Sequence, residues 1–208
     1  MKYIFAVLLL LSTRAAFAVD GQVLINQATI MASGGFPYKI TQPGSYKLSG
    51  NLAATGNTAV ILILTSHVTI DLNGFNVACN WTPNSGFVLS TCITDNFVMF
   101  TGITVRNGSI TAGANASVYN AGQTVVGLYL RSQGTTIEDI HFDSLGSGYS
   151  YAGLSVGINS IVRRNTFTND ASPNLGCPSL VEENVNGTPS VGSFGTGCKY
   201  INNVGLFQ

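Results

Sequence analysis

One six-residue pattern governs the architecture of this chain, and its fourth copy reads Val162-Arg163-Arg164-Asn165-Thr166-Phe167. The pattern is an apolar residue, two variable residues, a small, apolar or Asn residue, one variable residue and usually a second apolar residue. Its six copies are 33, 32, 25, 19 and 19 residues apart and begin at Leu72, Val105, Ile137, Val162, Val181 and Tyr200. Repeats of this length, each too thin to bury its own apolar face, are typical of a solenoid whose neighbouring units stack into one core.

Each copy predicts a strand with a bend in it. Residues three apart cannot both face inward along a straight strand, so the chain must turn between Val162 and Asn165. After the bend, Asn165, Asn184 and Asn203 occupy the same position in successive copies. We therefore expect an asparagine ladder, in which buried amides hydrogen-bond to each other and to the turn backbone. Ordinary turn propensity is the alternative explanation for these residues.

A second strand signal precedes several copies of the pattern. Apolar residues alternate there with period two, which predicts one buried face. The residues expected to point inward are Leu62 and Leu64, Leu128 and Leu130, and Leu154 and Val156. Each unit is thus predicted to be a strand, a turn and a bent strand.

Two further stretches of sequence lie at 40–52, ITQPGSYKLSGNL, and at 68–75, VTIDLNGF. With these and the downstream repeats, about residues 20–205 resemble the right-handed parallel β-helix proteins of the pectate-lyase-like superfold, in particular secreted bacterial proteins of this fold without an assigned function. The resemblance implies an all-β, single-stranded right-handed parallel β-helix with a short N-terminal cap. It does not imply one activity, because the superfold includes lyases, hydrolases, epimerases, adhesins and phage spikes. We expect residues 26–33 to form the cap as a short helix, with Asn26 as its N-cap.

The N-terminus and the composition indicate an exported protein. Lys2, an apolar run at 4–11 and Ala16-Phe17-Ala18 together read as a secretory signal peptide, which leaves 19–208 as a single β-helix domain. A retained membrane anchor is the alternative, although Arg14 interrupts the apolar run, and no other segment resembles a membrane span. Cleavage near Ala18 leaves seven Lys and Arg against nine Asp and Glu, a net charge of −2 that disfavours a nucleic-acid partner. Only 9% of residues are charged, which excludes a salt-bridged helical bundle.

The exported chain contains four cysteines, Cys79, Cys92, Cys177 and Cys198. An oxidising compartment favours two disulfides over free thiols. Neighbour pairing, Cys79 with Cys92 and Cys177 with Cys198, is the simplest of the three possible connectivities. A zinc site would need C-x-x-C pairs or nearby histidines, so we expect neither a metal nor a cofactor.

Sugar-cleaving proteins that resemble this chain usually place acids, arginines or lysines on the outer face of one parallel sheet. The strand before each repeat should place Ile63, Tyr129 and Ser155 outward, and none of these can act as a carboxylate base or hold calcium. Glycoside hydrolysis needs two carboxyl groups across the scissile bond, and Asp95 and Asp170 are the only loop acids that suit such a role. The expected catalytic face is therefore chemically empty.

Charged residues gather instead at the bend of the repeat, where their signs alternate from copy to copy. One column reads Arg106, Glu138, Arg163 and Glu182, and the next reads Asn107, Asp139, Arg164 and Glu183. We favour a surface salt-bridge ladder that sets the register of neighbouring strands. The competing hypothesis makes Arg164 a lyase-like base, with Asp139 and Glu183 as metal ligands on either side. These three residues are the candidate catalytic group, and His141 is expected to point outward alone.

Four aromatic residues fall in the loops that would flank the outer face, Trp81, Tyr119, Tyr149 and Tyr151. Flat rings suit stacking on sugars, which makes them candidate substrate-binding residues, and the alternative is that they cover the core beneath long loops. We therefore expect a monomeric extracellular or periplasmic protein, either a non-catalytic scaffold or a module that binds polysaccharide or cell-surface glycan. The alternative function is a polysaccharide lyase or glycoside hydrolase.

Overall fold

The computed structural model describes residues 21–56, 58–81, 90–114, 125–144, 151–169, 171–187 and 197–205. The predicted signal peptide, residues 1–18, lies outside the described residues. The described residues form one short helix, α1 (Gln27–Ala32), and a series of strands. The strands are β1 (Gln22–Ile25), β2 (Tyr38–Ile40), β3 (Gly44–Leu48), β4 (Leu52–Thr55), β5 (Ile61–Ile63), β6 (Val68–Asp71), β7 (Asn76–Trp81), β8 (Ser90–Thr94), β9 (Ile103–Ala114), β10 (Val125–Leu130), β11 (Thr136–Ser144), β12 (Tyr151–Val156), β13 (Ile161–Arg163), β14 (Thr166–Thr168), β15 (Ser172–Leu175), β16 (Leu180–Glu182), β17 (Val185–Asn186) and β18 (Lys199–Ile201).

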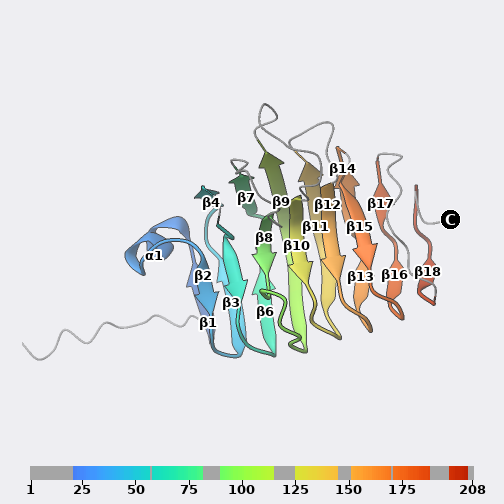
Figure 1. Ribbon diagram of the computed structural model, residues 1–208, viewed down its shortest axis with the longest axis horizontal. Helices are drawn as coiled ribbons and strands as arrows, with labels where there is room; N and C mark the ends of the chain where they lie inside the picture. The colour runs from blue at the N-terminus through green and yellow to red at the C-terminus, as the bar shows by residue number, and fades with distance from the viewer. Residues whose placement is uncertain are drawn as a thin grey trace, which may run out of the picture.

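The strands form two parallel sheets (Figure 1). The large sheet has 12 strands, and its main path runs β1-β3-β6-β9-β11-β13-β16-β18. The small sheet has 6 strands, in the order β15-β12-β10-β8-β5-β2. The chain passes in turn through the two sheets, and each pass through both makes one layer, called a rung below. The all-β class is confirmed, and the parallel sheets are consistent with a solenoid.

The repeat positions are stacked in register across the large sheet. Val105 pairs with Ile137, Ile137 with Val162, Val162 with Val181, and Val181 with Tyr200. The predicted starts of these five copies are therefore confirmed. At the bend that follows, Asn107, Asp139, Arg164, Glu183 and Asn202 adopt left-handed φ angles of 62°, 56°, 53°, 55° and 52°. One left-handed residue redirects the strand, which explains how residues three apart both reach the core.

The start of the first copy is predicted in the wrong register, whereas its last residue, Val77, pairs with Ile110 as expected. Ile70, and not Leu72, pairs with Val105, because the bend between Asp71 and Asn76 is longer than the corresponding bend between Arg106 and Ser109. Leu72 is buried within this longer bend. Its side chain fills the space beside Gly108, where a Cβ atom would lie only 2.5 Å from the Cβ of Leu72. Gly108, the small residue of the second copy, therefore leaves room for the side chain of Leu72.

The strand before the repeat is predicted correctly in two rungs and incorrectly in one. Leu128, Leu130, Leu154 and Val156 are buried, as expected. In β5, however, Ile61 and Ile63 point into the core, so the expected outward position of Ile63 and the expected inward position of Leu62 are both wrong. Residues 60–64 are all apolar, and such a run contains no alternation that could identify the buried face.

The core forms one cluster along the whole stack. In its later part, the rings of Phe142 and Phe167 stack with centroids 5.0 Å apart and an interplanar angle of 5°. Gly153 lies against both side chains, and a Cβ atom there would approach the Cβ of Phe142 to 3.0 Å and the ring of Phe167 to 3.2 Å. At the other end, α1 forms as expected, with Asn26 and Thr29 in a reciprocal capping box.

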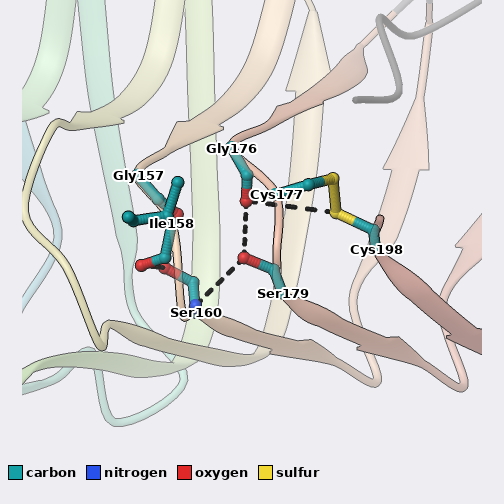
Figure 2. Close-up of a disulfide and its surroundings, with 7 residues drawn as sticks. All are labelled: Gly157, Ile158, Ser160, Gly176, Cys177, Ser179 and Cys198. Atoms are coloured by element: carbon teal, nitrogen blue, oxygen red, sulfur yellow. Dashed lines mark hydrogen bonds between the residues drawn. A yellow bond between two sulfur atoms is a disulfide. The ribbon is translucent and has the colours of Figure 1, made fainter. Parts of the chain in front are cut away.

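Two disulfides join Cys79 to Cys92 and Cys177 to Cys198, which is the neighbour pairing. The first bond is buried and the second is partly exposed. Figure 2 shows the second bond beside a column of hydroxyl side chains, in which Ser179 accepts a hydrogen bond of 3.0 Å from the backbone of Ser160 and donates one of 2.6 Å to Gly176. Two disulfides indicate an oxidising extracellular or periplasmic compartment. No helix in the described ranges is long and apolar enough to cross a membrane.

Candidate functional site

Asn165, Asn184 and Asn203 lie one above another directly after the bend. The Oδ1 of Asn184 accepts hydrogen bonds from the backbone N–H and the side-chain Nδ2 of Asn165, at 2.9 and 3.0 Å. Asn203 makes the same pair of contacts with Asn184 at the same distances. Each Nδ2 also donates to a backbone carbonyl before the bend of the preceding rung, those of Ile137, Val162 and Val181. The ladder therefore satisfies polar groups that the bend would otherwise leave unpaired in the core.

The first charged column is longer than the sequence pattern indicated. Pairing across the large sheet places Lys47 beside Asp71, Asp71 beside Arg106, Arg106 beside Glu138, Glu138 beside Arg163 and Arg163 beside Glu182. The signs alternate over six rungs. Lys47 and Asp71 were missed because the first repeat was set in the wrong register. Ion pairs form at 3.4 Å between Arg106 and Asp71 and at 2.6 Å between Arg163 and Glu138.

The candidate catalytic group is not symmetrical about Arg164. The guanidinium donates two hydrogen bonds of 2.8 Å to Asp139 and contacts Glu138 at 3.2 Å, so it faces one neighbouring rung. The hydrogen bond from Arg164 holds the pKa of Asp139 below its usual value. Among the described residues, no ion pair joins Arg164 to Glu183, which corrects the expected arrangement of Arg164 between two carboxylates. A guanidinium whose protons are engaged in this way is a poor candidate for a general base.

The outer face of the small sheet carries a neutral column of side chains. Pairing aligns Leu62 with Thr94, Thr94 with Tyr129, Tyr129 with Ser155 and Ser155 with Asn174. The column combines an aromatic ring with hydroxyl and amide groups, and it contains no acid. Lys39 lies next to Leu62 at the N-terminal edge. Leu62 takes the outward position that was expected for Ile63, and like Ile63 it cannot act as a carboxylate base.

Phe97 adds a second ring to this face. Its ring lies 5.1 Å from that of Tyr129, tilted by 54°. The sequence pattern did not identify Phe97, since it lies outside the repeats, and no alternation marks its direction. Together the two rings form an aromatic surface where β8 and β10 end.

The predicted loop aromatics are only partly described. Trp81 is the last residue of β7 and Tyr151 the first of β12, so both lie where strands meet the long loops. Tyr119 and Tyr149 lie outside the described residues, as does Asp170. That the four aromatic residues bind a substrate therefore stays a prediction.

Asp95 is the loop acid that the structure does describe, and it is fully buried. Its Oδ2 accepts hydrogen bonds from the backbone N–H and the hydroxyl of Ser132, at 2.8 and 2.7 Å, and its Oδ1 accepts one from the N–H of Phe97. Burial raises the pKa of Asp95, and these hydrogen bonds oppose the increase. Asp95 therefore joins neighbouring rungs and is not aimed at a substrate.

His141 is exposed on the large sheet, as expected, with its Nε2 3.0 Å from the hydroxyl of Thr168. Within the described ranges, no three His, Cys, Asp or Glu side chains gather closely enough to hold a metal ion. No family model, curated protein or solved structure matches this chain. The assignment of function therefore depends on the chemistry of its surfaces.

Proposed function

We propose that this chain is an exported right-handed parallel β-helix of the pectate-lyase-like kind that binds neutral glycans without cleaving them. The observation that carries the proposal is the outward column of the small sheet. Tyr129, with Phe97 beside it, offers an aromatic surface for the apolar face of a sugar ring. Ser155 and Asn174 follow in register and supply groups that hydrogen-bond to sugar hydroxyls.

The charge distribution supports binding over catalysis. The column contains no carboxylate between Leu62 and Asn174. Elsewhere, the guanidinium of Arg164 pairs with Asp139 and Glu138, and the buried carboxylate of Asp95 accepts a hydrogen bond from Ser132. From Tyr129 to Asn174, a polysaccharide that crosses successive rungs would meet a new polar group about every 4.8 Å, which suits an extended ligand.

The proposal is tested with affinity electrophoresis in gels that contain neutral or uronic-acid polysaccharides. We expect retardation by a neutral polysaccharide, and a roughly tenfold weaker affinity for Tyr129→Ala, because one stacking surface is lost. His141→Ala is the matched control, since it removes an exposed ring from the other sheet. Unchanged affinity of Tyr129→Ala, with an unchanged melting temperature, would overturn the site.

Catalysis is tested on the same polysaccharides. We expect no new reducing ends and no absorbance from unsaturated uronic acids. Either product would establish the lyase or hydrolase alternative in place of a binding module.

A further inference from the structure

The loop between β8 and β9 exposes three consecutive apolar side chains at the lower edge of the sheets (Figure 1). Phe97 is 49% exposed, Val98 46% and Met99 69%. Runs of three or four exposed apolar residues are rare in water-soluble proteins unless they have a function. The turns at 157–160 and 176–179 lie at the same edge, and there only Ile158 is a large exposed apolar residue.

The loop is held firmly in this exposed conformation. Asp95 receives hydrogen bonds from Phe97 and Ser132, and the N–H of Phe100 donates to the Ser132 hydroxyl at 3.2 Å. Asn96 and Phe97 both adopt left-handed φ angles, 52° and 66°. This conformation is unfavourable for a bulky side chain and persists only where surrounding contacts impose it. The polar groups of the loop therefore turn inward while its apolar tip faces solvent.

An arginine and a histidine, Arg131 and His67, lie beside the loop. The Thr101 carbonyl accepts a 2.9 Å hydrogen bond from the N–H of His67, and Arg131 directly precedes Ser132 in the chain. Both side chains are exposed, and Arg131 makes no ion pair with any described residue. Apart from buried Asp95, the acids of the described part lie on the large sheet or at its bend: Asp71, Glu138, Asp139, Asp143, Glu182 and Glu183.

The exposed area is too small for a stable interface with a second copy. The three side chains expose on the order of 300 Å². A stable protein interface needs about 800 Å² from each partner. A lipid surface places no such demand, because a short apolar segment enters the boundary of the acyl chains while adjacent cations remain among the headgroups.

We propose that Phe97, Val98 and Met99 insert into an anionic lipid surface and that Arg131 and His67 contact its headgroups. The protein would then rest on the membrane by the lower edge of its sheets. Phe97 also packs against Tyr129 of the proposed glycan site, so the two surfaces adjoin at this pair of rings. The outer face of the small sheet stays open from Ser155 to Asn174.

The test is co-sedimentation of the purified exported protein with sucrose-loaded vesicles. We expect binding to vesicles of phosphatidylglycerol and phosphatidylcholine, and at least fivefold weaker binding to phosphatidylcholine alone. The double variant Val98→Asp/Met99→Asp should lose at least fivefold of the anionic-vesicle affinity. Its melting temperature should change little, because Met99 is 69% exposed and Val98 is about half exposed. Val204→Asp is the matched control, since Val204 is 62% exposed at the C-terminal end of the stack.

Three results would overturn the lipid proposal. The first is absence of wild-type binding to anionic vesicles, and the second is equal binding by the wild type and the double variant. The third is self-association in analytical ultracentrifugation that the double variant abolishes, which would assign the loop to a second copy. Polysaccharide retardation of the double variant should remain at the wild-type level, so the failure of either proposal is seen separately.

Discussion

Single side chains at the bends hold neighbouring rungs together, and Arg164 shows how. Its guanidinium lies against Asp139 and Glu138 of the preceding rung, with both carboxylates in hydrogen-bond range. The pair with Asp139 is exposed, so its free energy is small and screened by salt. Its contribution should be visible chiefly as a dependence of stability on pH.

We predict that Arg164→Ala lowers the melting temperature slightly at pH 7 and weakens its dependence on acid pH. Asp139 has a lowered pKa in the folded protein, chiefly because Arg164 donates to it. Its stabilising contribution is therefore present above the ordinary Asp pKa and is lost as the pH falls through the lowered folded value. Melting curves between about pH 2 and pH 7 measure this, and Arg131→Ala is the control without an ion pair. A polysaccharide-cleaving activity that disappears in Arg164→Ala at unchanged melting temperature would contradict the structural role.

Asp95 makes a second inter-rung connection, and here the side chain is buried. We predict that Asp95→Asn lowers the free energy of unfolding by about 1–3 kcal/mol, because in either orientation the amide NH₂ would face a backbone N–H, that of Ser132 or that of Phe97, and leave it unpaired. Urea denaturation at pH 7 measures the change. Ser132→Ala, which keeps that backbone donor and removes only the hydroxyl, should cost less. Equal stability of Asp95→Asn and the wild type would show that the carboxylate is not needed as an acceptor.

At the scale of the element, the bend within each repeat consists of one residue with a left-handed φ angle followed by one residue whose side chain points inward. In the later rungs the inward residue is an asparagine, and in earlier rungs it is Ile140 or Gly108. Gly108 cannot extend the ladder, since Leu72 already occupies the space beside it. The ladder begins at Asn165, although the bends at Gly108 and Ile140 have the same length as the later ones.

The ladder predicts a graded loss of stability. Asn184→Ala should lower the free energy of unfolding by about 2–4 kcal/mol, because it leaves the N–H of Asn165 and the carbonyl of Val162 without partners in the core. Asn203→Ala should cost only about 1 kcal/mol, since this last member is partly exposed and water can replace it. Denaturant titrations of both variants give the comparison. Equal losses would mean that the position in the ladder does not matter.

At the scale of the whole molecule, each rung contacts mainly its neighbours, so stability is distributed along the stack. The two disulfides differ in their surroundings. Cys79–Cys92 lies in the core, whereas Cys177–Cys198 ties the last described rung to the one before it and is partly exposed.

We predict that limiting reductant opens Cys177–Cys198 first. Thiol–disulfide exchange requires access to a sulfur atom, and the core excludes the reductant from Cys79 and Cys92. Alkylation of the native protein followed by peptide mass spectrometry should therefore label Cys177 and Cys198 before the other pair. Earlier labelling of Cys79 and Cys92 would show that the first rungs open more readily than the last.

Local periodicity was sufficient to predict the class of this protein. The spacing of Val105, Ile137, Val162, Val181 and Tyr200 predicted the stacked strands and the bend, because inward and outward alternation is a property of each strand alone. The same spacing placed Asn165, Asn184 and Asn203 in one column. Cysteine order favoured the correct disulfides while leaving three connectivities open.

Only the tertiary structure decided how rungs of unequal length align. The long bend at Leu72 shifts the register, which adds Lys47 and Asp71 to the charged column. The uniformly apolar run at 60–64 has no periodicity, so its buried face depends on the strand it pairs with. Asp95 and Ser132, whose contact holds the exposed loop in place, are 37 positions apart in the sequence. Their proximity depends on the length of chain between rungs, and no local pattern of residues encodes that distance.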